Sequence, residues 1–210
     1  MSDRFKTEQE AFWAGEFGDD YISRNAGAAM LGSSIALLSK LLGRCPHAKS
    51  LIEFGANIGM NLKAVRALRP SMELGAIEIN ATAIAELRAW GGVNEVHEGS
   101  VLDFQAARTW DIALIKGVLI HINPDYLPQV YDSLFRASNR YILVVEYYNP
   151  KPVEVLYRGH AGRLFKRDFA GELLDRFPAL RAIDYGFVWH RDPVFPQDDA
   201  TWFVLEKVVR

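Results

Sequence analysis

The sequence predicts an α/β fold: a doubly wound sheet of seven strands, mostly parallel, with an antiparallel C-terminal hairpin. From residue 49 to residue 147, short apolar segments alternate with segments of helical periodicity, the order expected of parallel strands joined by helices. Residues 112–115 form a continuous apolar run, which is typical of a strand buried on both faces. The last two apolar segments are joined by a proline-containing loop with no room for a helix, so we expect them to pair antiparallel.

The individual elements follow from these periodicities and from the residues that end them. A helix over residues 7–13 has Thr7 as its cap and Glu10 three residues later, the pattern of a capping box. A second helix, over residues 28–42, ends at Gly43. Further helices are expected at residues 58–68, 81–90, 124–137 and 167–177, and strands at residues 49–54, 72–79, 93–97, 111–116, 140–147, 182–190 and 201–209.

Composition and charge narrow the class of protein. A chain of 210 residues with 50% hydrophobic and 24% charged residues is ordinary for one globular domain. The formal net charge of −2 gives no electrostatic reason to expect nucleic acid or an anionic membrane as a partner. The single cysteine, Cys45, cannot form an internal disulfide, and no apolar run resembles a signal peptide or a membrane span, so we expect a cytoplasmic protein. No metal site is predicted, and the oligomeric state is not indicated.

Residues 51–61 read as a strand, a glycine-containing turn and the start of a helix, which together make a binding corner. Gly55 and Gly59 allow the backbone to approach a ligand, and Asn57 is one of the few other residues that tolerate positive φ. A dinucleotide-binding turn would need glycine at the positions of Asn57 and Met60, and the Lys-Ser/Thr pair of a phosphate-binding loop is absent.

Three acidic residues surround this corner. Glu53 lies two residues before the first glycine, where its carboxylate could meet the cationic amino-acid part of a ligand. Glu78, near the end of the next strand, could accept the hydroxyls of a ribose. Asp103 follows the third strand, where it could accept an adenine amino group.

These residues resemble the class I S-adenosylmethionine-dependent methyltransferases, whose Glu/Asp-x-Gly-x-Gly-x-Gly segment matches Glu53, Gly55 and Gly59 and departs at Asn57. The resemblance implies a Rossmann-like methyltransferase domain over residues 46–210, preceded by an N-terminal arm and helix over residues 1–45. It also implies that the arm, residues 1–25, closes over S-adenosylmethionine, although simple packing of its aromatic residues is the alternative. The implied cofactor contacts are Glu53, Gly55, Ala56, Asn57, Gly59, Asn61, Glu78, Ile79, Ser100, Val101, Asp103 and Lys116.

A closer resemblance is to the small methylases of pseudaminic acid biosynthesis. It is carried by residues 7–13, 18–21, 24–25, 53–59 and 118–122. The resemblance implies O- or N-methylation of a sugar of the nonulosonic acid pathway, so the partner would be a small acidic or nucleotide-linked sugar.

Candidate catalytic and acceptor residues lie just after the fourth and fifth strands. His121 could be a general base, or a histidine that packs beneath the cofactor or caps the helix beginning at Pro124. Glu146, the other catalytic candidate, could face the acceptor with Tyr147 and Tyr148, or pair with a cation while the tyrosines belong to the core. Lys116 could contact substrate or pair with Glu146.

A basic segment follows the fifth strand and is expected to be a loop. Arg158, His160 and Arg163, together with Tyr157, could bind an acidic acceptor, since arginine makes bidentate contacts with carboxylates. A solvated surface loop is the alternative. For the whole chain, two other functions remain open: a non-catalytic S-adenosylmethionine-binding protein, and a nucleic-acid methyltransferase, although the Asn-Pro-Pro-Tyr run of amino-methylating enzymes is absent.

Overall fold

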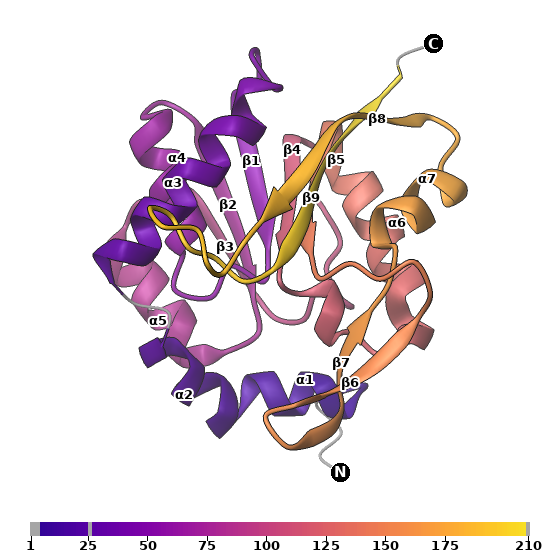
Figure 1. The fold of residues 1–210 in the computed structure, drawn as a ribbon. Helices are drawn as coiled ribbons and strands as arrows, with labels where there is room; N and C mark the ends of the chain where they lie inside the picture. Colours follow the sequence, from indigo (N-terminus) through magenta and orange to yellow (C-terminus); the bar gives the residue numbers. More distant parts are fainter. Residues whose placement is uncertain (1–4, 25–26, 209–210) are drawn as a thin grey trace.

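The computed structural model describes residues 5–24 and 27–208, and a seven-stranded sheet forms its centre (Figure 1). The strand order is β3-β2-β1-β4-β5-β9-β8, and only β9 runs against its neighbours. The predicted sheet with its antiparallel C-terminal hairpin is therefore confirmed. Its strands are β1 (Ser50–Phe54), β2 (Glu73–Glu78), β3 (Glu95–Glu98), β4 (Trp110–Lys116), β5 (Ser138–Glu146), β8 (Leu180–Val188) and β9 (Ala200–Lys207).

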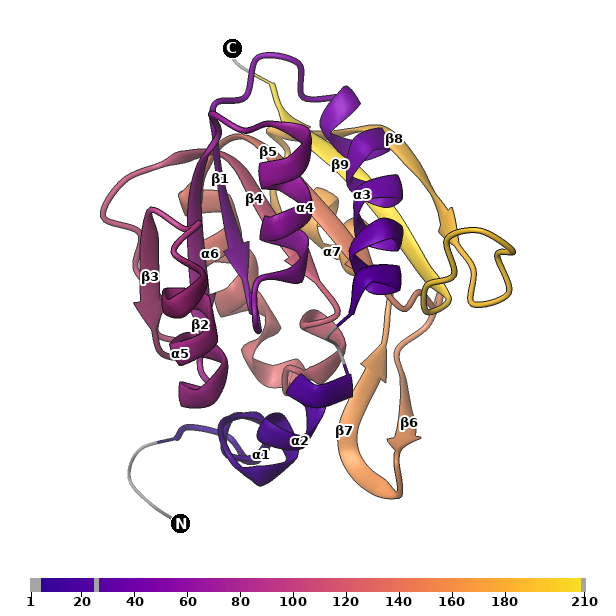
Figure 2. The ribbon, with the colours of Figure 1, turned by 90° about the vertical axis from the view of Figure 1, so that its left-hand side faces the viewer.

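Helices cover both faces of the sheet (Figure 2). One face carries α3 (Ala28–Gly43), α4 (Met60–Leu68) and α5 (Ala81–Trp90), and the other carries α6 (Leu127–Ala137) and α7 (Phe169–Arg176). Neighbouring residues of the central strands face opposite layers: Leu51 packs with the α3–α4 cluster and Ile52 with the α6–α7 cluster. This two-sided burial explains why the central strands are apolar without alternation.

The N-terminal arm differs from the prediction by one helix. The predicted helix is α1 (Glu8–Ala14), and its capping box is confirmed, because Thr7 Oγ1 accepts from the Glu10 N–H at 3.1 Å and Glu10 accepts from the Thr7 N–H at 2.9 Å. A second helix, α2 (Glu16–Arg24), was not predicted. Its glycine and its two adjacent acidic residues obscure the helical pattern in the sequence. Asn25 and the side chain of Arg24, which contributed to the closer resemblance, lie outside the described residues.

The basic segment is a β-hairpin rather than a loop. Strands β6 (Val153–Tyr157) and β7 (His160–Lys166) pair antiparallel around a two-residue turn. The turn residues, Arg158 and Gly159, have φ of 51° and 86°, as a tight hairpin turn with two left-handed residues requires. The prediction failed because most side chains of β6 are exposed, so no alternation of buried and exposed residues reveals the strand. The hairpin and the arm meet at the carboxyl end of the sheet (Figure 1).

Two short 3-10 turns complete the fold. Residues 124–137 begin with a short 3-10 turn, η2 (Pro124–Tyr126), and a second 3-10 turn, η1 (Leu119–His121), follows β4. Within the described residues, no helix is both long and apolar enough to cross a membrane.

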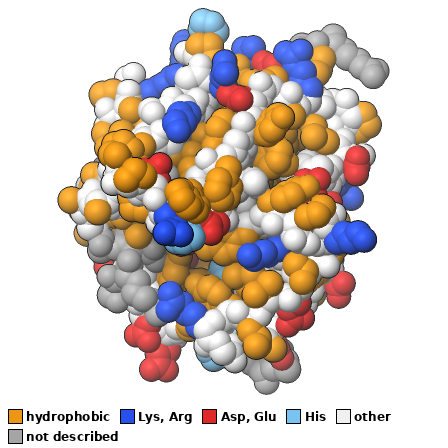
Figure 3. Space-filling view, in the orientation of Figure 1, with side chains coloured by type: hydrophobic (Ala, Val, Ile, Leu, Met, Phe, Trp, Pro, Cys, Tyr) orange, Lys and Arg blue, Asp and Glu red, His pale blue; other side chains and the backbone are white. Residues whose placement is uncertain are grey.

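The face that carries the edge strand β8 exposes both hydrophobic and charged side chains (Figure 3). The exposed hydrophobic side chains include Tyr185 and Phe187.

A substitution of Gly75, on β2, tests how tightly the centre of the sheet is packed. A Cβ added there would lie 2.7 Å from the buried ring of Trp110 and 3.2 Å from Ile52. We expect Gly75→Ala to lower the free energy of unfolding by about 1–3 kcal/mol in urea titrations, because the core must shift to admit a methyl group. Gly43→Ala is the matched control, since nothing lies within 4 Å of its added Cβ and alanine favours a helix. Equal stability of the two variants would contradict this account of the packing.

Candidate functional site

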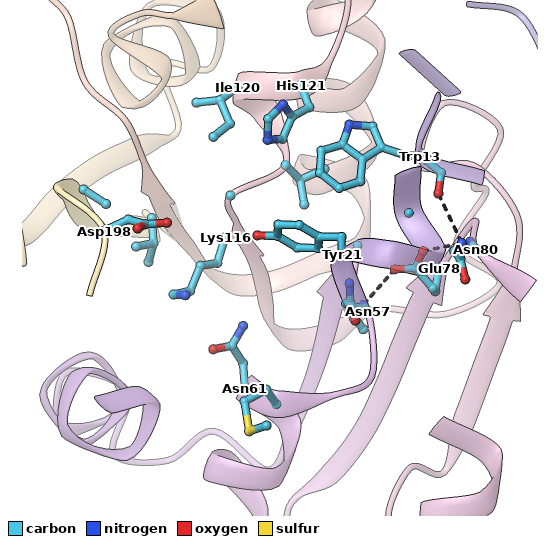
Figure 4. A pocket seen from close by; sticks show the side chains of 18 of the residues that line it. Trp13, Tyr21, Asn57, Asn61, Glu78, Asn80, Lys116, Ile120, His121 and Asp198 are labelled. Atoms are coloured by element: carbon cyan, nitrogen blue, oxygen red, sulfur yellow. Dashed lines mark hydrogen bonds between the residues drawn. The ribbon is translucent and has the colours of Figure 1, made fainter. Parts of the chain in front are cut away.

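A cavity of about 790 Å³ lies at the carboxyl ends of the central strands, beneath the arm (Figure 4). This volume is near the upper end of the range for small-molecule sites, so it has room for more than one small molecule. The predicted site residues that line it are Gly55, Ala56, Asn57, Asn61, Glu78, Ile79, Ser100, Val101, Lys116, His121, Tyr147, Tyr157 and Arg158. The predicted site residues that do not line it are Glu53, Gly59, Asp103, Glu146, Tyr148, His160 and Arg163.

The binding corner has the backbone expected from its sequence. Gly55, Asn57 and Gly59 have φ of 73°, 49° and 76°, all in the left-handed region. The reasons for the two glycines differ, because a Cβ on Gly55 would meet Val118 at 2.5 Å and one on Gly59 would meet Leu87 at 2.6 Å. Gly59 therefore permits close packing against α5 and does not contact the cavity. The N-terminus of α4 has no side-chain cap.

Glu78 joins the two turns that form one wall of the cavity. Its carboxylate accepts the backbone N–H groups of Asn57 at 2.7 Å, Ile79 at 2.9 Å and Asn80 at 2.8 Å. Burial raises the pKa of this carboxyl group, and the three bonds oppose that shift. A carboxylate offers about four acceptor sites, so one remains for a ligand hydroxyl without the loss of a protein contact.

Glu53 and Asn61 form the floor beneath the corner. Asn61 donates to Glu53 at 2.7 Å and accepts from the Ser34 hydroxyl at 3.2 Å. Burial raises the pKa of Glu53 to about 8, and its second oxygen has no partner among the described residues. The predicted contact between Glu53 and a ligand would therefore pass through Asn61, which lies between that carboxyl group and the cavity.

Glu146 lies behind the cavity wall rather than in it. One carboxylate oxygen accepts the N–H groups of Val118 and Leu119, both at 2.9 Å, and so fixes the turn after β4. Burial raises the pKa of Glu146 to about 7. Glu146 therefore supports the β4–η1 turn and does not line the cavity, whereas its position after the fifth strand led us to expect it there.

His121 lines the cavity, and its Nε2 has no hydrogen-bond partner among the described residues. Its Nδ1 donates to the backbone carbonyl of Arg163 at 2.6 Å, because a carbonyl can only accept. The ring packs against both Trp13 and Tyr157, with ring centroids 4.6 Å and 4.9 Å away. Burial lowers the pKa of His121 to about 4, so the imidazole is neutral at pH 7 and its Nε2 is a hydrogen-bond acceptor.

Some side chains of the basic hairpin contact the arm, and others line the cavity. Arg163 forms an ion pair with Glu8 at 3.1 Å, and the His160 ring packs 5.1 Å from that of Phe12. Both side chains therefore hold the arm instead of lining the acceptor site. Arg158, at the tip of the hairpin, does line the cavity.

Two further predicted residues also have other partners. Asp103 pairs with Lys6 of the arm and does not line the cavity. The ring of Tyr148 is 41% exposed, outside the cavity. The neighbouring Tyr147 lines the cavity and donates to Asp198 at 2.8 Å.

Sequence reasoning did not single out several cavity residues. Asn80 caps α5 and donates to the carbonyl of Trp13, and its position two residues after Glu78 was the available signal. Trp13 itself was noted only as part of the arm. Asp198 comes from the proline-containing loop between β8 and β9, where no local pattern indicates a site.

No protein-family model and no curated protein matches the sequence. Solved structures of methyltransferases, however, have the same fold. Magnesium protoporphyrin IX methyltransferase from Synechocystis is similar over 97% of this chain and 100% of its own, with a TM-score of 0.71 and 11% identity. Burkholderia thailandensis 1,6-didemethyltoxoflavin-N1-methyltransferase is similar over 95% and 87%, with a TM-score of 0.70 and 17% identity. The glycopeptide N-methyltransferase MtfA is similar over 85% and 96%, with a TM-score of 0.63 and 14% identity. At these identities the likeness establishes a methyltransferase-like, Rossmann-type fold.

The neutral His121 makes stability depend on pH. Its folded pKa of about 4 lies below the ordinary 6.5, so the unfolded chain binds a proton that the folded protein does not. The free energy of unfolding should therefore fall by roughly 2 kcal/mol from this residue between pH 7 and pH 4.5. Glu53 and Glu146, whose pKa values are raised by burial, act in the opposite direction over this range. Urea unfolding at both pH values should therefore compare the wild type with His121→Phe: acidification should cost the wild type about 2 kcal/mol more than it costs the variant, so the variant loses that part of the wild-type pH dependence. A variant of the exposed His47, His47→Gln, should keep it, and an unchanged dependence in His121→Phe would contradict the burial of a neutral ring.

Proposed function

We propose that this chain is an S-adenosylmethionine-dependent methyltransferase that acts on a small molecule. The observation that carries the proposal is the position of Glu78, whose carboxylate faces the cavity from the end of β2, beside the left-handed turn at Asn57. In this fold, an acid at the end of the second strand is placed to bind a ribose. Two of the similar structures, the 1,6-didemethyltoxoflavin-N1-methyltransferase and the magnesium protoporphyrin IX methyltransferase, were solved with S-adenosylhomocysteine bound.

The residues present fit this cofactor. Glu78 retains one acceptor site for a ribose hydroxyl, and Ser100 and Val101 line the adjoining part of the cavity, where they would flank the adenine. Gly55 leaves the corner without a side chain where the sulfur end of the cofactor would pass. The missing glycines disfavour a nicotinamide dinucleotide at the same corner.

The protein would contribute alignment, exclusion of water and a proton acceptor. The bound cofactor supplies an electrophilic methyl group, which the acceptor displaces from sulfur. His121 Nε2 would accept the proton of an acceptor hydroxyl or amine during this step. Because the ring is already neutral at pH 7, no prior loss of a proton is needed. Trp13 and Tyr157, which both pack against the imidazole, would exclude water from it.

The acceptor we infer is a small acidic sugar, methylated on oxygen or nitrogen. The resemblance to methylases of pseudaminic acid biosynthesis supports a nonulosonic acid pathway sugar, and Arg158 is a cation at the cavity that would meet its carboxylate. A free, buried Cys45 thiol suits the reducing cytoplasm in which we expect the protein to act.

Cofactor binding is the first test. We expect S-adenosylmethionine and S-adenosylhomocysteine to raise the melting temperature, and NAD to leave it unchanged. In calorimetry, Glu78→Gln should weaken S-adenosylhomocysteine binding by about 1–3 kcal/mol, because it removes a charge-assisted hydrogen bond. Glu98→Gln, an exposed change at the end of β3, is the control and should bind as the wild type does. Stabilisation by NAD alone would overturn the proposal.

The second test concerns the arm, which we propose closes over the cofactor. Phe12 does not line the cavity but stacks on Phe17 with centroids 4.1 Å apart and packs on His160 of the hairpin. Phe12→Ala should therefore speed the dissociation of S-adenosylhomocysteine about 2–10-fold in stopped-flow experiments, because it weakens these contacts. Tyr185→Ala removes an exposed aromatic ring of β8 and should leave the rate unchanged. An unchanged rate in Phe12→Ala would reduce the arm to a packing role.

A further inference from the structure

Lys116 is a half-buried cation that has no ion pair and no hydrogen bond with the other described residues. It ends β4 and lines the cavity, and burial lowers the pKa of its ammonium group. The charges of Glu53, Asp198 and Glu146 oppose this shift, yet among the described residues none forms an ion pair or a hydrogen bond with Lys116. A cation that is partly removed from water and has no partner is costly, so a bound anion would stabilise it.

The nearby carboxyl groups are each engaged with another partner. Glu53 accepts from Asn61, and its pKa of about 8 keeps most of the group protonated at pH 7. Glu146 binds the backbone of the turn after β4. Asp198 accepts from the Tyr147 hydroxyl. The site at Lys116 is therefore suited to an anion that the ligand brings.

The direction of the side chain indicates which part of a ligand it would meet. In the sheet, Ile115 of β4 pairs with Phe54 of β1, so the next residue, Lys116, lies beside the glycine corner. Figure 4 shows its ammonium group pointing toward Asn61, away from His121 and across the corner from Glu78. A molecule whose ribose is held at Glu78 would have to cross Gly55 to reach this cation.

We propose that Lys116 binds the carboxylate at the amino-acid end of S-adenosylmethionine, and so fixes the cofactor at the end opposite Glu78. This inference rests on the proposed function. Asn61 would assist, because one of its two amide N–H groups is bonded to Glu53 and the other is available. An acid on the acceptor has the same chemistry, so the test must separate the two sources of the carboxylate.

Decarboxylated S-adenosylmethionine separates them, since it lacks only the group in question. Calorimetry would measure the binding of S-adenosylmethionine and of its decarboxylated form to the wild type and to Lys116→Met, without any acceptor. For the wild type, removal of the carboxylate should weaken binding about tenfold or more, as expected for a charged hydrogen bond. For Lys116→Met, both compounds should bind with affinities equal within about twofold.

Two controls test whether the effect is specific to Lys116: the stability of Lys116→Met and the binding by a second lysine variant. Methionine in place of lysine removes a half-buried charge that has no partner, so thermal melting should show that Lys116→Met is folded and at least as stable as the wild type. Lys40→Met removes the same charge from an exposed position on α3 and should keep the wild-type difference between the two compounds. If decarboxylation costs Lys116→Met as much as it costs the wild type, the inference is overturned while the proposed function stands. Failure of the wild type to bind either compound would overturn both.

Discussion

The carboxylate of Glu78 is the group on which the shape of the cavity depends. It accepts N–H groups from Asn57 after β1 and from Ile79 and Asn80 after β2, and so ties two turns of the sheet together. These bonds offset the cost of a buried carboxylate. Asn80 in turn donates to the carbonyl of Trp13, so the position of the arm depends on the same group of contacts.

The parts that could be predicted from the sequence are those specified locally. The left-handed turn at Asn57 and the capping box at Thr7 depend on residues a few positions apart, and both occur as expected. The burial of β1 and β4 on both faces follows from their continuous apolar composition. The acid at the end of β2 could likewise be assigned to the cavity, because the order of the elements alone brings that strand end to the corner.

What could not be predicted depends on partners far along the chain. Arg163 looked like an acceptor contact until its partner Glu8, on the arm, was known. Asp103 similarly pairs with Lys6. Glu146 is a carboxylate that supports a turn, and no sequence signal distinguishes that task from catalysis. The hairpin was missed because its outer strand is exposed and therefore carries no periodic pattern.

One residue of the hairpin, Arg163, serves two structures at once. Its backbone carbonyl holds the proton on Nδ1 of His121, and its side chain holds the arm through Glu8. Strand β7 therefore both selects the tautomer of the imidazole and anchors the arm above the cavity. A displacement of β7 would therefore disturb the ion pair that holds the arm and the hydrogen bond that orients the imidazole at the same time.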